Sequence, residues 1–187
     1  MVISMIVDGD QNVVRKVESF RNELKANPKI LKTSTSEAIP GGGINFTLFS
    51  VESKNDFVDK GVDVYGIDEY YLNTMNIDLI KGRNFSKAGS DTAHGLIVNE
   101  SMVKEFGWGD NALGKKVKYP GDTSGAYLEV VGVVKDFHQK SLYNPITPLM
   151  LVYRSYNNII EAKLNSTEIT GTVAFIENAW KKTFPGL

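Results

Sequence analysis

Residues 129–142, EVVGVVKDFHQKSL, pass from a continuous apolar run into Lys135, Asp136, Phe137 and His138. A short run rich in valine predicts a buried strand, and the polar residues after it predict a loop at the end of that strand. Asp136 and His138 stand two residues apart, which puts both side chains on one face of an extended chain. An acid and an imidazole in this arrangement are candidates for general acid–base catalysis.

A structural interpretation of this corner is simpler than a catalytic one. A hydrolase also needs a nucleophile and an oxyanion hole. Ser141 is close, but Asp-x-His-x-x-Ser matches no working order of a catalytic triad, and the sequence holds no G-x-S-x-G. We expect Asp136 to accept backbone N–H groups in the turn that begins at Gln139, and Phe137 and Leu142 to be buried. We expect Gly132 to allow close approach of a neighbouring segment. A hydrolase stays the alternative.

The composition is that of an ordinary globular protein of 187 residues, 42% hydrophobic and 23% charged. The 21 basic residues nearly balance the 22 acidic ones, so no surface for nucleic acid is expected. The absence of cysteine excludes disulfides and thiolate ligands within this chain. The 2 histidines lack the spacing of a metal site, so we expect no metal and no cofactor. The longest apolar runs fall short of the roughly 18 to 20 residues that cross a bilayer, which predicts a soluble chain.

The first forty residues predict a strand, a helix and a second strand. Residues 2–8 are a β-prone run, and residues 30–35 alternate as a strand does. Between them, residues 11–26 repeat apolar side chains at the spacing of one helix face, namely Val13, Val17, Phe20 and Leu24. The opening is therefore βαβ-like.

Ile39-Pro40-Gly41-Gly42-Gly43 is the strongest break in the sequence and predicts a lobe boundary. The residues after it form short elements, including a helix over residues 100–106 with Asn99 as its N-cap. Long strands return near the end of the chain, and a helix follows them. We therefore predict an α+β fold in two lobes: a discontinuous lobe of residues 1–40 and 126–187, and an inserted, smaller mixed α/β lobe of residues 41–125.

GDNALGK, residues 109–115, matches the G-x-x-x-x-G-K of a phosphate-binding loop, but its context argues against one. Lys116 stands where Ser or Thr should meet magnesium, and a strand follows where a helix should begin. We predict a turn here. Pro145-Ile146-Thr147-Pro148 likewise predicts a rigid strand entry rather than a ligand for SH3-type grooves.

Four stretches occur in an order that resembles one known family. They are YGIDEYYLNTMNIDLIKGRNFS (65–86), LIVNESMVKEFGW (96–108), NALGKKV (111–117) and EVVGVVKDFHQKSLYNPITPLMLVY (129–153). Together they closely resemble the MacB-like extracytoplasmic core domain of bacterial ABC-transporter permeases, in the macrolide-exporter and lipoprotein-release superfamily. The resemblance implies structural roles for a set of signature residues: Gly82, Arg83, Phe85, Asn99, Glu100, Gly114, Lys115, Gly132, Asp136, Phe137, His138 and Pro148.

The resemblance implies a porter-like lobe with an inserted lobe, on the periplasmic side of the bacterial inner membrane between two transmembrane helices. It implies a domain that is not an enzyme and that couples ATP hydrolysis by a separate cytoplasmic subunit to export or signalling. The implied partners are the transmembrane helices of the full-length permease, the ATPase subunit, and a periplasmic protein or a peptide or lipid cargo. A module that binds a peptide or lipid in the inter-lobe cleft is the alternative.

Two further expectations concern individual contacts. Movement between lobes needs a few residues that absorb the change in backbone dihedrals, and we expect Pro40, Gly41, Gly42 and Gly43, with residues 120–125, to be this hinge. We also expect Arg83 and Glu100 to form an ion pair within the inserted lobe.

Overall fold

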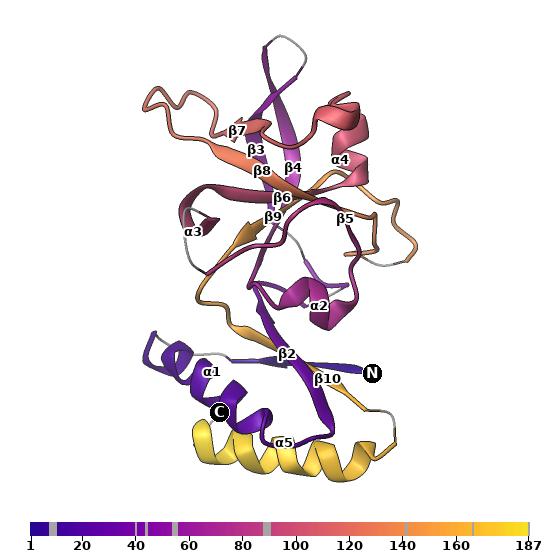
Figure 1. Ribbon diagram of the computed structural model, residues 1–187. Coiled ribbons are helices and arrows are strands. Elements are labelled where there is room, and N and C mark those ends of the chain that lie inside the picture. Colours follow the sequence, from indigo (N-terminus) through magenta and orange to yellow (C-terminus); the bar gives the residue numbers. More distant parts are fainter. Residues whose placement is uncertain are drawn as a thin grey trace.

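The computed structural model describes residues 1–7, 11–39, 41–43, 45–53, 56–87, 91–140, 142–165 and 167–186. Its elements mix helices and strands along the chain (Figure 1). In chain order they are β1 (Val2–Ile6), α1 (Gln11–Leu24), β2 (Ile30–Ser36), β3 (Asn45–Glu52), β4 (Phe57–Ile67), α2 (Tyr71–Met75), β5 (Leu79–Gly82), α3 (Asp91–His94), β6 (Gly95–Asn99), α4 (Glu100–Glu105), a 3-10 turn (Gly109–Asn111), β7 (Lys116–Lys118), β8 (Leu128–Val134), β9 (Leu149–Tyr153), β10 (Ile159–Leu164) and α5 (Ile169–Thr183).

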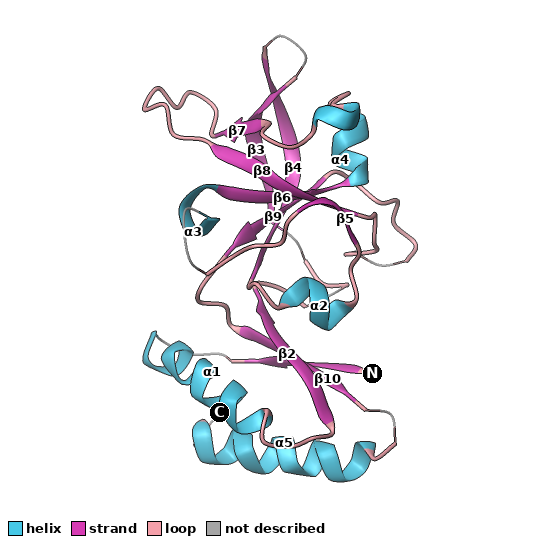
Figure 2. Ribbon diagram, in the orientation of Figure 1, coloured by secondary structure: helices cyan, strands magenta, loops and turns pink. Residues whose placement is uncertain are grey.

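Six strands close into a ring, which we call the barrel. β4 pairs with β3, the pairing continues through β7, β8 and β6 to β9, and β9 returns to β4 in parallel orientation. These strands occupy the upper part of the molecule in Figure 2. Closure pairs both edges of the strands in the ring. The sequence did not predict it, because the closing pair joins residues 63–67 to residues 149–153.

Successive side chains of β6 and β9 enter two different buried clusters. Leu96 and Met150 belong to a cluster shared with α4, whereas Ile97 and Leu151 belong to one shared with α2. Strands that are covered on both faces read as continuous apolar runs rather than as alternating ones. This double burial explains why GLIVN and LMLVY hold hardly any charged or polar residue.

β1, β10 and β2 form the other end of the sheet, and α1 and α5 cover one face of it, which together we call the α/β layer (Figure 1). The predicted helix stripe is confirmed for Val17, Phe20 and Leu24, which are buried against β10 and α5. β10 lies antiparallel between β1 and β2, so the βαβ-like opening is split by a strand from the end of the chain.

β8 and β9, which the sequence analysis assigned to the discontinuous lobe, lie in the barrel. Val130 and Met150 share a buried cluster with Phe49 and Val117, because β8 pairs with β7 and β6 while β9 pairs with β4. Residues 120–125 therefore connect two paired strands of the barrel. The chain leaves the α/β layer between β2 and β3 and returns to it between β9 and β10. The exact lobe bounds stay a prediction.

The helices are short. The longest, α5, has 15 residues, and no helix in the part of the chain that the structure describes is long and apolar enough to cross a membrane.

Candidate functional site

Asp136 binds the start of α4. Its Oδ1 accepts the backbone N–H of Ser101 at 2.9 Å, and its Oδ2 accepts the Ser101 hydroxyl at 2.7 Å. In return, Oε2 of Glu100 accepts the backbone N–H of Asp136 at 3.0 Å. The expected role of Asp136 as an acceptor of backbone N–H groups is correct. Its expected partner in the turn at Gln139 is wrong, because the carboxylate reaches the first turn of a helix distant in sequence.

Ser101, Asp136 and His138 are not arranged as a catalytic relay. The Ser101 hydroxyl donates directly to Asp136, with no imidazole between them, and the His138 side chain is exposed. A serine is activated when its hydroxyl donates to a base that a third group orients. Ser141, the other candidate nucleophile, lies outside the described residues. The geometry around Asp136 instead holds the end of β8 against α4.

Asn99 is the N-cap of α4, as predicted, and also fixes the entry to β9. Its Oδ1 accepts the backbone N–H groups of Met102 and Leu149, both at 3.0 Å, and its Nδ2 donates to the Thr147 carbonyl at 2.9 Å. The side chain is 1% exposed. A buried amide whose nitrogen and oxygen both have hydrogen-bond partners specifies one arrangement of the segments it joins.

The turn after β5 brings Arg83 to Asp91, not to Glu100. Arg83 forms a two-point ion pair with Asp91, with Nη2 to Oδ1 at 2.8 Å. The Arg83 hydrogen bond lowers the pKa of Asp91 below its ordinary value. The expected Arg83–Glu100 pair is therefore wrong, because Glu100 is bound to the Asp136 backbone.

Gly82 and Gly132 face each other in the β5–β8 ladder. A Cβ on Gly132 would lie 2.5 Å from the Arg83 carbonyl oxygen, and one on Gly82 would lie 2.2 Å from the Val131 carbonyl oxygen. Gly82 also has a φ of 71°, in the left-handed region. The close approach expected at Gly132 is confirmed. Two further signature side chains pack into the cluster beside α2: Phe85, which is 5% exposed, and Phe137, which is partly buried. The expected burial of Leu142 is wrong, because this side chain is 78% exposed in the loop after β8.

The G-x-x-x-x-G-K segment is a turn, as predicted. It contains the 3-10 turn Gly109–Asn111, and a strand follows it. The Gly114 N–H donates to the Val130 carbonyl at 2.9 Å, and Lys115 Nζ lies 2.7 Å from Glu52 Oε1. With Glu52 bound, the lysine has a structural partner, so we assign no phosphate site here.

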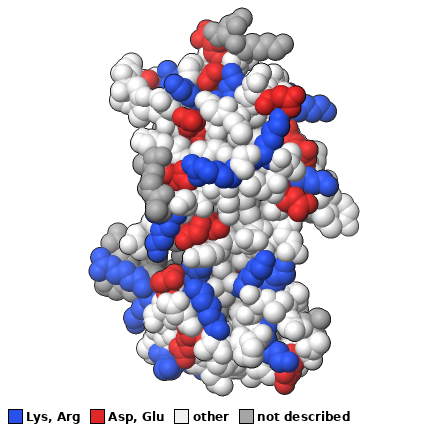
Figure 3. Space-filling model, viewed as in Figure 1, with Lys and Arg blue, Asp and Glu red and all other residues white. Residues whose placement is uncertain are grey.

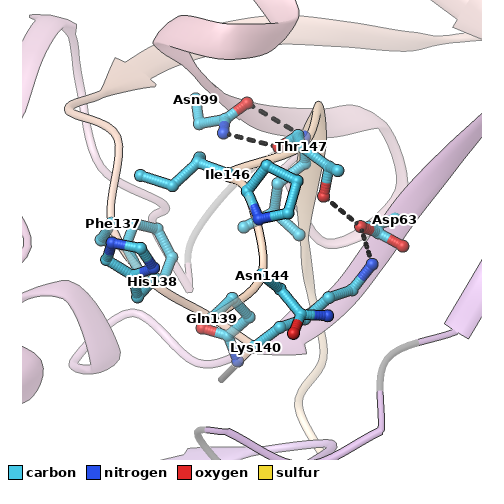
Figure 4. A pocket seen from close by; sticks show the side chains of 11 residues that line it. Asp63, Asn99, Phe137, His138, Gln139, Lys140, Asn144, Ile146 and Thr147 are labelled. Atoms are coloured by element: carbon cyan, nitrogen blue, oxygen red, sulfur yellow. Dashed lines mark hydrogen bonds and ion pairs between the residues drawn. The ribbon is translucent and has the colours of Figure 1, made fainter. Parts of the chain in front are cut away.

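The loop from Phe137 to Pro148 folds over β4 (Figure 4). Buried Asp63 accepts hydrogen bonds from Lys140 Nζ and Thr147 Oγ1, each at 2.6 Å. The Gln139 carbonyl accepts the N–H of Gly41 at 2.8 Å, which ties this loop to the crossing between β2 and β3. Among described residues, Gln139 Nε2 is buried without a hydrogen-bond partner.

Glu161 is a fully buried carboxyl where the α/β layer meets the barrel. It lies on the face of β10 opposite α1 and α5, and it accepts hydrogen bonds from Ser34 Oγ at 3.0 Å and from Ser36 Oγ. Burial raises the pKa of Glu161 to about 8, although both serine hydroxyls act in the opposite direction. This carboxyl is therefore mostly protonated at neutral pH.

Two tyrosines from the barrel side continue this network. The Tyr65 hydroxyl lies 3.2 Å from Ser36 Oγ and donates to the Ala38 carbonyl, and the Tyr71 hydroxyl lies 3.3 Å from that of Tyr65. Both rings are buried, and burial raises the pKa of both phenols. A hydrogen-bonded chain thus runs from β10 through β2 to β4 and α2.

Asp68 and Arg21 form a second buried contact across the same junction. Arg21 Nη1 lies 3.1 Å from Asp68 Oδ2, and both side chains are 5% exposed. Asp68 also accepts the Thr35 N–H at 3.0 Å, and Arg21 Nη2 donates to the Thr33 carbonyl at 3.2 Å. Burial raises the pKa of Asp68 to about 6, outweighing the opposite effect of Arg21. We define the junction network as Glu161 with its two serines, the hydroxyls of Tyr65 and Tyr71, and the Asp68–Arg21 pair.

The junction network was not predicted from the sequence. A signal for it exists: residues 32–36 of β2, KTSTS, hold no apolar side chain, and Glu161 interrupts the apolar run at the start of IIEAKL. A polar strand beside a charged strand predicts a polar face, but not what covers it. Among the described residues, no three His, Asp or Glu side chains converge as a metal site would require.

Known proteins resemble this chain over most of its length. The model of the MacB-like periplasmic core domain matches residues 3–175. The periplasmic region of MacB from Actinobacillus actinomycetemcomitans is 16% identical, with a TM-score of 0.63 over 97% of this chain and 84% of that chain. The extracellular domain of the noncanonic ABC-type transporter YknZ from Gram-positive bacteria is 16% identical, with a TM-score of 0.62 over 97% and 94%.

No curated protein sequence matches this chain. The structural likenesses, at low identity, show a shared mixed α/β fold, and the family model covers most of the chain. The chain therefore belongs to the family of MacB-like periplasmic core domains, which are extracytoplasmic domains of membrane-anchored ABC-transporter permeases.

Proposed function

We propose that this domain, without catalysis of its own, couples ATP hydrolysis by a separate cytoplasmic subunit to export or signalling outside the membrane. The coupling is a change in the angle between the α/β layer and the barrel. The transmembrane helices of the full-length permease carry the movement to and from the ATPase. A ligand or partner biases such a movement only through its different affinities for the two arrangements.

The observation that carries this proposal is the narrow connection between two separately packed halves. The ladder between β2 and β4 holds one residue pair, Ser36 and Ile67. Two backbone hydrogen bonds flank it, from Glu37 to the Gly66 carbonyl at 2.9 Å and from Asp68 to the Thr35 carbonyl at 3.1 Å. By contrast, β3 and β4 pair through eight residues on each strand. The α/β layer has a buried cluster made from its own elements, and the barrel has another. A rotation about the Ser36–Ile67 contact leaves both cores intact, which is the condition for movement of rigid lobes.

The polarity of the junction also supports movement. The junction network consists of hydrogen bonds and one ion pair, and such contacts are directional and can be exchanged for others. A wide apolar interface would resist the same displacement, because opening it exposes apolar surface to water. Polar buried contacts therefore favour a small number of defined arrangements over one fixed interface.

The two crossings of the chain are the proposed hinges. We place one at the predicted segment of Pro40, Gly41, Gly42 and Gly43, and the other at residues 154–158 in place of residues 120–125. Gly41 has a φ of 84°, and nothing lies within 4 Å of a Cβ built on Gly43. Pro40 lies outside the described residues. The Gly42 N–H donates to the Ile39 carbonyl at 2.8 Å, and proline at position 42 would remove this donor. Gly43→Pro alone should therefore stop coupling in the full permease without unfolding the domain.

A disulfide across the junction tests the coupling directly, since the chain has no other cysteine. A Cβ built on Gly66 would lie 3.2 Å from the Cβ of Glu37, close to the roughly 3.5 to 4.5 Å that a disulfide needs. We expect Glu37→Cys/Gly66→Cys, once oxidised, to lower the ATPase turnover of the assembled permease, and a reductant to restore it.

A disulfide within the barrel is the matched control. Ser50 and Asp59 are paired on β3 and β4, and their side chains are in hydrogen-bond contact. Oxidised Ser50→Cys/Asp59→Cys should leave ATPase turnover unchanged. Equal turnover of the oxidised and reduced junction variant would contradict the coupling proposal.

A second candidate function is a ligand-binding module that uses the junction. It is favoured by one observation, an open cavity of about 400 Å³ whose walls come from both halves. Titration of the isolated domain with peptides and lipids, followed by calorimetry, separates this function from coupling. A ligand that binds the domain without altering the ATPase turnover of the permease would support the ligand-binding module over the coupling function.

A further inference from the structure

The junction cavity is built from three elements of the two halves. The end of α1 and the first residues of β2 form one wall, and α2 with the turn before it forms the other. Basic side chains gather across the middle of the molecular face that Figure 3 presents, between α2 and the lower helices. The cavity volume of about 400 Å³ falls in the range of small-molecule sites, roughly 300 to 1,000 Å³.

Two lysines give this cavity its charge. Lys25 Nζ lies 3.3 Å from Asn22 Oδ1, and Lys32 Nζ donates to the Asn73 carbonyl at 3.2 Å. Neither lysine has an ion-pair partner among the described residues, and none of the residues that line the cavity is acidic. Lysine ammonium groups with neutral partners remain available to a carboxylate or phosphate.

Apolar surface lies beside these charges. Leu31 is 54% exposed and Tyr70 is 47% exposed, and both line the cavity together with buried Ile30. The guanidinium of Arg21 lies 5.0 Å and Lys25 Nζ lies 5.8 Å from the centre of the Tyr70 ring. Arg21 is already paired with Asp68, so the charge that remains uncompensated belongs to the two lysines.

We propose that the junction cavity binds a small amphiphilic anion, in which a carboxylate or monophosphate head is joined to an apolar body. The head lies between Lys25 and Lys32, and the body covers Leu31 and the ring of Tyr70. Charge and apolar surface are both required, because exposed lysines alone bind anions weakly in water and salt. Since the walls belong to both halves, such a ligand favours the arrangement in which the cavity has this width.

Isothermal titration calorimetry on the chain itself tests the proposal with four probes below their micelle concentrations. Octanoate and octyl phosphate carry both parts of the recognised chemistry, and their relative affinities distinguish a carboxylate from a phosphate head. Octanol lacks the charge, and inorganic phosphate lacks the apolar body. We expect saturable binding of octanoate or octyl phosphate, at least ten times tighter than that of either incomplete probe.

The variant Lys25→Gln/Lys32→Gln should bind the better probe at least ten times more weakly. Lys135→Gln/Lys181→Gln is the matched control: it removes the same charge from two exposed lysines outside the cavity and should bind as the parent does. Amide NMR shifts at Leu31 and Asn73 on ligand addition locate the site independently of any variant. Unchanged affinity in the cavity variant, or equal binding of an incomplete probe, overturns the proposal, as does the absence of saturable binding. The measurement is made without the ATPase, so its failure leaves the coupling function untouched.

Discussion

Ser36 donates a hydrogen bond to Glu161 on the face of the α/β layer that meets the barrel. The same hydroxyl lies 2.9 Å from the Ala38 carbonyl. An ionised Glu161 accepts the Ser36 hydrogen, whereas a protonated Glu161 donates to Ser36 Oγ and the serine hydrogen turns to Ala38. The junction network is thus hydrogen-bonded in both states, and the free-energy difference between them comes mainly from burial of the charge.

Glu161→Gln should flatten the dependence of stability on pH. The folded pKa of about 8 lies above the ordinary value of 4.5, so the folded protein keeps a proton that the unfolded chain releases. The contribution of Glu161 to stability is then greatest below pH 4.5 and falls as pH rises towards 8, by roughly 5 kcal/mol in all. Urea unfolding at pH 5, 7 and 9 measures this slope. A parent protein equally stable at all three pH values would contradict it, and the exposed Glu105→Gln serves as control.

Arg21→Met should destabilise the domain by about 3 kcal/mol, because it leaves Asp68 buried without its cation. Arg21→Met/Asp68→Leu should recover more than half of that loss, since neither charge then remains in the junction. Denaturant unfolding of the single and double variants completes the cycle. Additive losses in the double variant would mean that the two side chains are not coupled.

Asp136→Ala should lower the free energy of unfolding by about 1 to 2 kcal/mol, because Ser101 at the start of α4 loses an acceptor for its N–H and its hydroxyl. His138→Gln should change it by less than about 0.5 kcal/mol, as is usual for an exposed side chain. Chemical denaturation measures both. In the full permease, His138→Gln should retain full ATPase turnover; loss of turnover at unchanged stability would reopen the catalytic interpretation of this corner.

Gly82→Ala should cost more than Gly114→Ala, by about 2 kcal/mol or more. Both glycines have φ in the left-handed region, 71° and 80°, so the backbone penalty is similar. Only at Gly82 would the new Cβ meet backbone, at 2.2 Å from the Val131 carbonyl oxygen, whereas Gly114 is open. Thermal unfolding measures the loss of stability in each variant, and the difference between the two losses is the steric contribution at Gly82. Equal losses would show that β5 and β8 can separate without cost.

Much of the local structure was predictable. The stripe of Val17, Phe20 and Leu24, the cap at Asn99 and the turn at Gly114 are each confirmed, because helix periodicity, capping and positive φ depend on neighbouring residues. The type of interaction was predicted for Arg83, an ion pair, and for Asp136, acceptance of a backbone N–H, but the partner of each was not. A guanidinium or a carboxylate needs an opposite group, and which one lies nearby depends on the packing of segments distant in sequence.

Apolar periodicity, capping residues and turn residues in the chain were enough to place α1, β2, α4 and β8 and to support the resemblance to a permease domain. Closure of the barrel through β4 and β9, and the meeting of Glu161 with Ser36, were settled only by the tertiary structure. The reason is physical. The residues of a strand indicate whether it will be buried, but which strand it pairs with depends on the apolar surface that the whole assembled fold buries.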